Sequence, residues 1–260
     1  MIPSAFITAW SSTAPWPTDT QIEQDLILSR FIVEIANDEV LGPEFAMRGG
    51  TCLHKLHLST PARYSEDLDY VRRTRSGIGP YLDALRRIAT GVGLVEHAYE
   101  QSGQMVHMIF DAKPTSGVGK IRVKIETNIR EVESFADYVT RLYAVDSPWW
   151  TGVADVTTFS VEELMGTKLR ALYQRRKGRD LFDLWLVLTT LGPDVRLIID
   201  AFSHYMGEEA FSFPNSPQTS PKNLLTTSSE RIWPNWWWIR PGSTSSTRRR
   251  IWSWKLLARS

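Results

Sequence analysis

Residues 48–72, RGGTCLHKLHLSTPARYSEDLDYVR, contain the two features that decide the fold. Gly49 and Gly50 interrupt one apolar run, and Asp67 and Asp69 stand at the beginning of the next. Alternate residues of a strand point to the same face, so a strand that begins at Asp67 brings both carboxylates together. Two carboxylates on one face repel each other unless a cation lies between them, and Mg²⁺ prefers such oxygen ligands. This pattern predicts a metal-binding strand, with a solvated acidic strand edge as the alternative.

The glycine pair predicts a turn between a short apolar element and a short helix at residues 51–58. A backbone without side chains can approach a ligand closely, and a helix that begins at Thr51 would offer free N–H groups to a phosphate. We therefore expect Gly49, Gly50 and Thr51 to lie against a phosphate group. The alternative is an ordinary turn between a strand and a helix.

Residues 121–128 alternate between apolar and charged or polar side chains, which predicts a strand with Glu126 on its polar face. A third carboxylate on a strand beside the aspartate pair would complete a two-metal site. One ion would activate an attacking hydroxyl, and the other would hold a triphosphate and its leaving group. The alternative is a surface glutamate paired with Lys124 or Arg122.

Residues 161–175 predict a helix that is capped by Ser160. Lys168 and Arg175 lie on the same face of this helix as Leu164. Two partly buried cations on one face suit a bound triphosphate. The alternative is a pair of long side chains that extend over a core towards water.

Asp180 and Asp183 stand three residues apart at the beginning of the next predicted helix, residues 179–191. The helix dipole favours acidic residues at that position whatever their function. Asp180 could also orient Lys168 or Arg175 through a salt bridge.

The order of the elements predicts an α+β fold, because strands and a few helices come first and helices follow. We expect a core at residues 1–158, a helical lobe at 159–211 and a separate tail at 212–260. The other predicted elements are helices at 19–38 (with Asp19 as N-cap), 79–90 and 194–210, strands at 94–100 and 105–111, and two strands within 138–158.

The chain of 260 residues is 42% hydrophobic and 23% charged, and its net charge is +1, which is typical of a globular protein. Cys52 is the single cysteine and fits a reducing compartment. No apolar run approaches the roughly 20 residues that span a bilayer. The N-terminus shows no basic segment followed by an apolar one. We therefore expect a cytoplasmic protein without a membrane segment.

Residues 212–260 differ in composition from the rest. They hold eight Lys or Arg, one acid, 15 Ser or Thr and six of the eleven tryptophans, while residues 1–211 hold 22 basic and 28 acidic residues. Three explanations are open: a basic aromatic tail that binds RNA by stacking, a disordered low-complexity segment, or a segment translated out of frame.

The order of these motifs resembles that of the nucleotidyltransferase superfamily. It is most similar to the AbiEii/AbiGii toxin family of type IV toxin–antitoxin and abortive-infection systems, over about residues 19–210. The residues that carry the resemblance are Glu23-Gln24-Asp25, residues 48–57 and 63–69, Lys124-Ile125-Glu126, and residues 163–168 and 179–183.

The resemblance implies a polymerase-β-like nucleotidyltransferase core, with a mixed sheet and flanking helices, and a helical C-terminal lobe. It implies Mg²⁺ at Asp67 and Asp69 with help from Glu126, and it puts Asp180 in the family's final motif. The predicted catalytic residues are Asp67, Asp69, Glu126 and Lys168. The predicted nucleotide-binding residues are Gly49, Gly50, Thr51, Ser65, Lys168, Arg175 and Asp180.

The resemblance also implies partners. Relatives transfer a nucleotide from an NTP to RNA, with tRNA as a known target, and a partner antitoxin neutralises them. The excess of acids in residues 1–211 favours a protein or a small molecule as acceptor instead, because an RNA binder should present a basic face. A patch of five arginines could supply that face: Arg72, Arg73, Arg75, Arg86 and Arg87. An inactive remnant of such a toxin is the third alternative.

Overall fold

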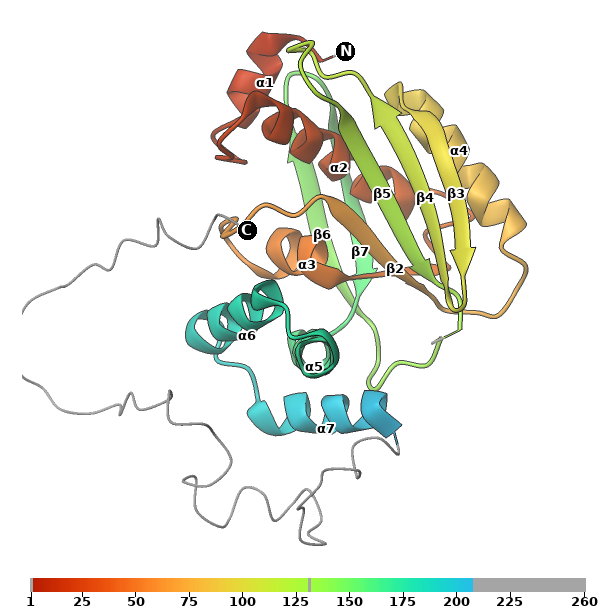
Figure 1. Cartoon of the computed structure of the whole chain (residues 1–260), viewed down its shortest axis with the longest axis vertical. Coiled ribbons are helices and arrows are strands. Elements are labelled where there is room, and N and C mark those ends of the chain that lie inside the picture. Colours follow the sequence, from red (N-terminus) through yellow and green to blue (C-terminus); the bar gives the residue numbers. More distant parts are fainter. Residues whose placement is uncertain (1, 131, 208–260) are drawn as a thin grey trace, which may run out of the picture. The chain divides into compact units, whose positions relative to one another are not determined.

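A computed structural model of the chain describes residues 2–130 and 132–207 (Figure 1). In this part of the chain, seven strands form one mixed sheet: β1 (Phe45–Arg48), β2 (Asp67–Arg72), β3 (Val95–Ser102), β4 (Met105–Ala112), β5 (Ile121–Asn128), β6 (Val139–Asp146) and β7 (Thr151–Thr158). Their order across the sheet is β3-β4-β5-β2-β1-β7-β6. Neighbouring strands are antiparallel except for β2 with β5 and β1 with β7, which are parallel.

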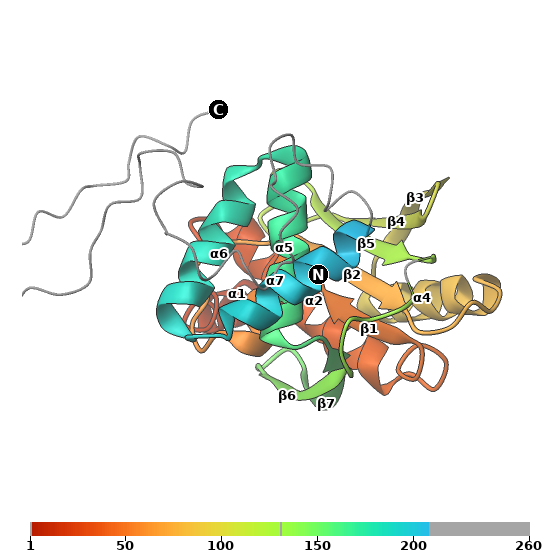
Figure 2. The same ribbon diagram turned by 90° about the horizontal axis from the view of Figure 1, so that it is seen from below.

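The helices precede, interrupt and follow the strands. They are α1 (Ser4–Trp10), α2 (Asp19–Asn37), α3 (Gly49–Cys52), α4 (Gly79–Val92), α5 (Val161–Arg175), α6 (Gly178–Thr190) and α7 (Val195–Met206), with a π-helical turn, Leu53–His57, after α3. Figure 1 shows α5, α6 and α7 grouped below the sheet, and Figure 2 looks onto this group from below. None of the described helices is both long and apolar enough to cross a membrane. All of these elements belong to one compact unit, residues 1–210.

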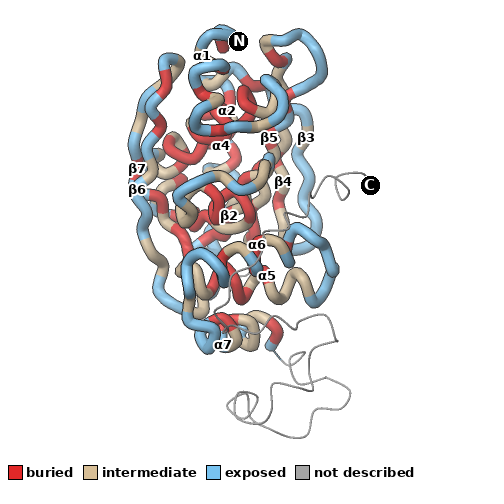
Figure 3. Tube along the Cα trace, turned by 90° about the vertical axis from the view of Figure 1, so that its left-hand side faces the viewer, coloured by how far each residue is buried: buried red, intermediate tan, exposed pale blue. Residues whose placement is uncertain are grey.

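One face of the sheet forms the hydrophobic core with α2 and α4. Phe31 of α2 contacts Phe110 of β4, with ring centroids 6.3 Å apart, and Tyr81 of α4 contacts Phe45 of β1 at 6.0 Å. The alternating apolar residues of β5 are fully buried, because a strand turns every second side chain towards the same face. In Figure 3 the buried stretches gather at the centre, whereas the outer strands β3 and β6 are mostly exposed.

The helices after β7 pack closely on each other. A Cβ atom at Gly166 of α5 would lie 2.7 Å from the Cβ atom of Ala201 of α7, so only glycine permits this approach. Ser160 caps α5 by accepting a hydrogen bond from the backbone N–H of Glu163, as its sequence predicts. The Glu163 carboxylate is buried and accepts a hydrogen bond of 2.7 Å from the backbone N–H of Phe135. Glu163 therefore connects α5 to the segment that precedes β6.

The structure confirms the α+β class and the mixed sheet, and it differs from the sequence-based expectations in detail. Helix α1 was not predicted. Thr18 rather than Asp19 caps α2, because its side chain accepts a hydrogen bond from the backbone N–H of Gln21. The short helix expected from residue 51 already begins at Gly49. The tail at 212–260 lies outside the described residues, and the division of residues 1–211 into a core and a lobe stays a prediction.

Candidate active site

The face of the sheet opposite α2 and α4 carries the predicted carboxylates. In the parallel pair of β2 and β5, Asp69 lies directly beside Glu126, and Asp67 lies beside Lys124. Residues in register point to the same side, so all three acids share one face. Arg48 of β1 pairs with Asp69 in register. The sheet thus brings together Asp67 and Asp69, which are two residues apart, with Glu126, which is distant in sequence.

These acids repel one another. Burial and then the charge of Glu126 raise the pKa of Asp69 to about 7, although Arg48 and Lys168 oppose the shift. Burial and the charge of Glu126 also raise the pKa of Asp67. Burial works against ionisation of Glu126 as well, but the hydrogen bond and charge of Lys124, together with His107 and Asp69, lower the pKa of that carboxyl. Burial and mutual repulsion both disfavour the charged forms of Asp67 and Asp69, and a divalent cation would offset both.

The donor set fits Mg²⁺ in chemistry, because carboxylate oxygens are its preferred protein ligands. In the part of the chain that the structure describes, no group of three or more His, Cys, Asp or Glu side chains is gathered tightly enough to hold an ion as it stands. The carboxylate of Glu126 forms an ion pair with Lys124. This is the pairing that the sequence left open as an alternative. Glu126 would have to release Lys124 to become a third ligand.

The glycine turn is built around the side chains of other site residues. Gly49 has a φ of +85°, and a Cβ atom there would lie 2.7 Å from Cγ of Asp69. A Cβ atom at Gly50 would lie 3.2 Å from Oγ of Ser65. Thr51 Oγ1 lies 2.9 Å from Oγ of Ser65 and 2.5 Å from the carbonyl oxygen of Asp67. The lack of a side chain at Gly49 leaves room for Asp69, and the lack of one at Gly50 leaves room for Ser65. Both are predicted site residues.

A second charged group lies on α5 and α6. Lys168 is 9% exposed, and its Nζ atom lies 3.3 Å from Oδ1 of Asp180 and 2.9 Å from Oδ2 of Asp183. Nε of Arg175 lies 3.6 Å from Oδ2 of Asp180, and the Arg175 side chain is half-exposed. Asp180 thus contacts both cations, as the sequence suggested. The charge of Lys168 opposes the rise in the pKa of Asp69, so Lys168 lies close enough to act on that carboxyl.

Sequence patterning did not pair Asp183 with Arg63 or His54. The Asp183 side chain has no exposed surface, and both of its oxygens accept hydrogen bonds of 2.7 Å from Arg63. His54 Nε2 lies 3.3 Å from Oδ1 of the same carboxylate. Burial opposes ionisation, but the hydrogen bonds from Arg63 and His54 and the charge of Lys168 hold the pKa of Asp183 well below its usual range. Arg63 and Asp183 both stand in the motifs quoted above, yet no local signal pairs residues so far apart.

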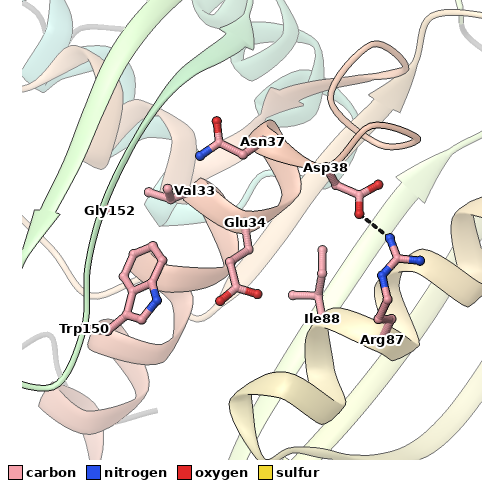
Figure 4. Close-up of a pocket in the computed structure, with 8 residues that line it drawn as sticks. All are labelled: Val33, Glu34, Asn37, Asp38, Arg87, Ile88, Trp150 and Gly152. Atoms are coloured by element: carbon pink, nitrogen blue, oxygen red, sulfur yellow. Dashed lines mark hydrogen bonds and ion pairs between the residues drawn. The ribbon is translucent and has the colours of Figure 1, made fainter.

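A pocket of about 340 Å³ lies away from the predicted carboxylates, between α2, α4 and the beginning of β7 (Figure 4). None of the predicted site residues lines it. Its charged groups have partners within the fold, since Arg87 pairs with Asp38 and Glu34 accepts a hydrogen bond from Arg30. We therefore assign the chemistry to the carboxylate face and not to this pocket.

Four of the five arginines that the sequence offered as a basic face for RNA have acidic partners within the fold. Arg72 is buried and donates to Glu44 at 2.9 Å. Arg86 donates to Glu96 at 2.6 Å. Arg75 and Arg87 also have acidic partners, Glu133 and Asp38. Arg73 instead donates to the carbonyl oxygen of Pro43. Four of the five charges are therefore paired with acids, and the basic face stays a prediction.

The fold is similar to that of a solved nucleotidyltransferase toxin. MenT4, a nucleotidyltransferase toxin from Mycobacterium tuberculosis H37Rv, matches 88% of this chain over 79% of its own, with a TM-score of 0.57 and 15% sequence identity. JHP933 from Helicobacter pylori matches 66% of this chain over 68% of its own, with a TM-score of 0.47 and 15% identity. No curated protein matches the sequence.

A match between the sequence and a family model shows the family. Residues 30–237 match the model of a family described as nucleotidyl transferase AbiEii toxin, type IV TA system. The match covers more than half of the chain and includes every predicted site residue. The chain therefore belongs to the AbiEii family of nucleotidyltransferase toxins of type IV toxin–antitoxin systems.

Proposed function

We propose that this protein is a Mg²⁺-dependent toxin that transfers a nucleotide from an NTP to an RNA acceptor, with tRNA as the expected one. The observation that carries the proposal is the register of β2 and β5, which sets Asp69 beside Glu126 and next to the glycine turn. The family supports nucleotidyl transfer and a partner antitoxin. The metal, the acceptor and the residue roles are inferred from the site chemistry and the family resemblance.

Asp67 and Asp69 would hold the metal. Glu126 would become a third ligand once its ion pair with Lys124 is broken. The metal would neutralise the triphosphate and activate the attacking hydroxyl. Lys168 and Arg175 would add positive charge for the phosphates, with Asp180 holding both side chains in place. In the transfer, the acceptor oxygen loses its proton and bonds to the α-phosphorus, while the bond from that phosphorus to the bridging oxygen breaks and pyrophosphate leaves.

A second candidate is a nucleotidyltransferase of the same chemistry that acts on a protein or a small molecule. The paired arginines and the excess of acids in residues 1–211 favour it, because neither provides a basic surface for nucleic acid. A catalytically inactive toxin remnant is the third candidate.

The test uses the purified full-length chain, each labelled NTP, Mg²⁺, and either bulk tRNA, total RNA or cell protein. We expect label in the tRNA band with at least one NTP. Label in protein alone would replace the RNA acceptor with the second candidate, and no label with any NTP would sink the enzymatic proposal. Asp69→Asn should lose at least about a hundredfold in rate. Asp155→Asn, an exposed aspartate on β7, is the matched control and should transfer label normally.

A further inference from the structure

Arg63 connects the helical segment after β7 to the glycine turn. Its Nε and Nη2 atoms each donate a 2.7 Å hydrogen bond to Asp183 of α6, and Nη1 donates to the carbonyl oxygen of Tyr64 at 3.2 Å. The side chain is only 20% exposed, and that of Asp183 is fully buried. A guanidinium held by two parallel hydrogen bonds has a fixed orientation.

The fixed guanidinium lies against the turn. A Cβ atom at Gly50 would lie 2.5 Å from Nη2 of Arg63, so glycine at position 50 makes room for this group. The same virtual atom would lie 3.2 Å from Oγ of Ser65. The Arg63 guanidinium and the Ser65 hydroxyl therefore meet over one backbone position.

Arg63 has donors to spare for a ligand. A guanidinium carries five N–H donors, and the three hydrogen bonds above are those that Arg63 makes with the residues the structure describes. One remaining donor is on Nη2, the atom against Gly50, and the other is on Nη1. A planar fork of donors matches phosphate oxygens better than the single ammonium of a lysine does.

Lys168 shares the same anchor. Its Nζ atom lies 2.9 Å from Oδ2 of Asp183, the oxygen that also accepts from Nη2 of Arg63. One buried carboxylate thus sets the positions of two cations, one on the segment before β2 and one on α5. Groups that are already fixed lose little conformational entropy when they bind a ligand.

We propose that Arg63 is a further ligand of the NTP triphosphate at the glycine turn, and that Asp183 is the positioning residue that holds it there. The inference rests on the proposed function, because it takes the turn as the place where the triphosphate binds. The structural alternative is that the Arg63–Asp183 pair only fastens α6 to the core.

Binding affinities separate these two roles. We would measure the affinity of the full-length chain for Mg²⁺–NTP and for the matching NMP by calorimetry, using the NTP that gives transfer. Arg63→Gln should weaken NTP binding about tenfold or more, because a charge-assisted hydrogen bond is lost, and should leave NMP binding unchanged. Arg63→Lys should restore only part of the loss. Equal losses for NTP and NMP, or no loss at all, would overturn the proposal.

A double variant tests the positioning role. If Asp183 acts through Arg63, Asp183→Asn should weaken NTP binding less in the Arg63→Gln background than in the wild type, because only its effect on Lys168 remains. Equal losses in the two backgrounds would overturn this role. Arg72→Gln is the matched control, since Arg72 is also buried and donates to a carboxylate, Glu44. It should lower stability and keep the ratio of NTP to NMP affinity.

The wild-type chain supplies a test that needs no variant to fold. Phenylglyoxal modifies arginine side chains, and peptide mass mapping locates the modified residue. Mg²⁺–NTP should protect Arg63 strongly and the matching NMP should not, whereas equal protection would contradict a triphosphate contact. If the wild type transfers label but these tests fail, only the inference about Arg63 falls. If it transfers no label, the proposed function falls first.

Discussion

The carboxylate of Asp69 occupies the space that a side chain at Gly49 would need, since a Cβ atom there would lie 2.7 Å from the Asp69 Cγ atom. Gly49 also has a φ of +85°, which other residues rarely adopt. The turn and the carboxylate are therefore one structural unit. Gly49 cannot gain a side chain without moving Asp69, a predicted metal ligand.

This relationship makes Gly49→Ala a test of the site. We expect the free energy of unfolding to fall by about 1–3 kcal/mol, from backbone strain and the clash with Asp69. Nucleotide transfer should be lost in the molecules that remain folded. Urea denaturation and the labelled-NTP assay measure the two effects.

Gly103→Ala is the control for strain alone. Gly103 also has a positive φ, of +57°, but a Cβ atom there would meet no atom within 4 Å. This variant should lose some stability and keep full transfer. Equal loss of transfer in both variants would count against a special role for Gly49.

Asp69 should lower the stability of the metal-free chain as the pH rises. Its pKa is about 7 in the fold against 3.8 for an ordinary aspartate, because burial and Glu126 disfavour its charge. Between these values the folded state binds more protons than the unfolded state, so the free energy of unfolding falls as the pH rises. Asp69→Asn should remove this part of the slope, as measured by urea denaturation in the presence of a chelator.

The effect of Mg²⁺ on the free energy of unfolding is a second test of Asp69. It should stabilise the wild type at pH 7 and should stabilise Asp69→Asn much less, because the variant lacks a ligand charge. Asp155→Asn should behave as the wild type. A variant that keeps the wild-type slope and the wild-type response to Mg²⁺ would refute the assignment of Asp69.

His57 should lower the stability of the fold as the pH falls, whereas Asp69 lowers it as the pH rises. Burial and then the charge of Arg141 lower its pKa from 6.5 to about 4, and neither ring nitrogen has a hydrogen-bond partner among the described residues. The unfolded chain takes up the proton at a higher pH, so the free energy of unfolding falls as the pH drops from 6.5 to about 4. His57→Leu should flatten this slope relative to the wild type. His97→Gln, at a half-exposed position, should not.

Asp25 illustrates a family-motif residue that we expect to be structural. Its carboxylate accepts hydrogen bonds of 2.9 Å from the indole N–H groups of Trp10 and Trp16, and from Lys55. Asp25→Asn leaves the Lys55 ammonium without its anionic partner, which should cost about 3–5 kcal/mol in the free energy of unfolding. The folded fraction should still transfer nucleotide at the wild-type rate. A rate loss without a stability loss would instead indicate a role in catalysis.

Local patterns were sufficient for most of the fold. The alternation of residues 121–128 predicted β5, and the apolar spacing of residues 79–90 predicted α4, because the side-chain period of a strand or a helix is visible in a short window. Helix α1 was missed because seven residues between prolines and polar residues show too few periods. The two-residue period of a strand also placed Asp67 and Asp69 on one face.

The sequence by itself determined the family, the α+β class and the residue types of the candidate site, since these depend on motifs and local periodicity. Only the tertiary structure decided which charges meet. It paired Glu126 with Lys124, gathered Arg63, His54 and Lys168 around Asp183, and gave acidic partners to four of the five arginines offered as an RNA-binding patch. The physical reason is that an ion pair depends on a few ångströms between atoms, and for residues far apart in sequence the packing of strands and helices sets that distance.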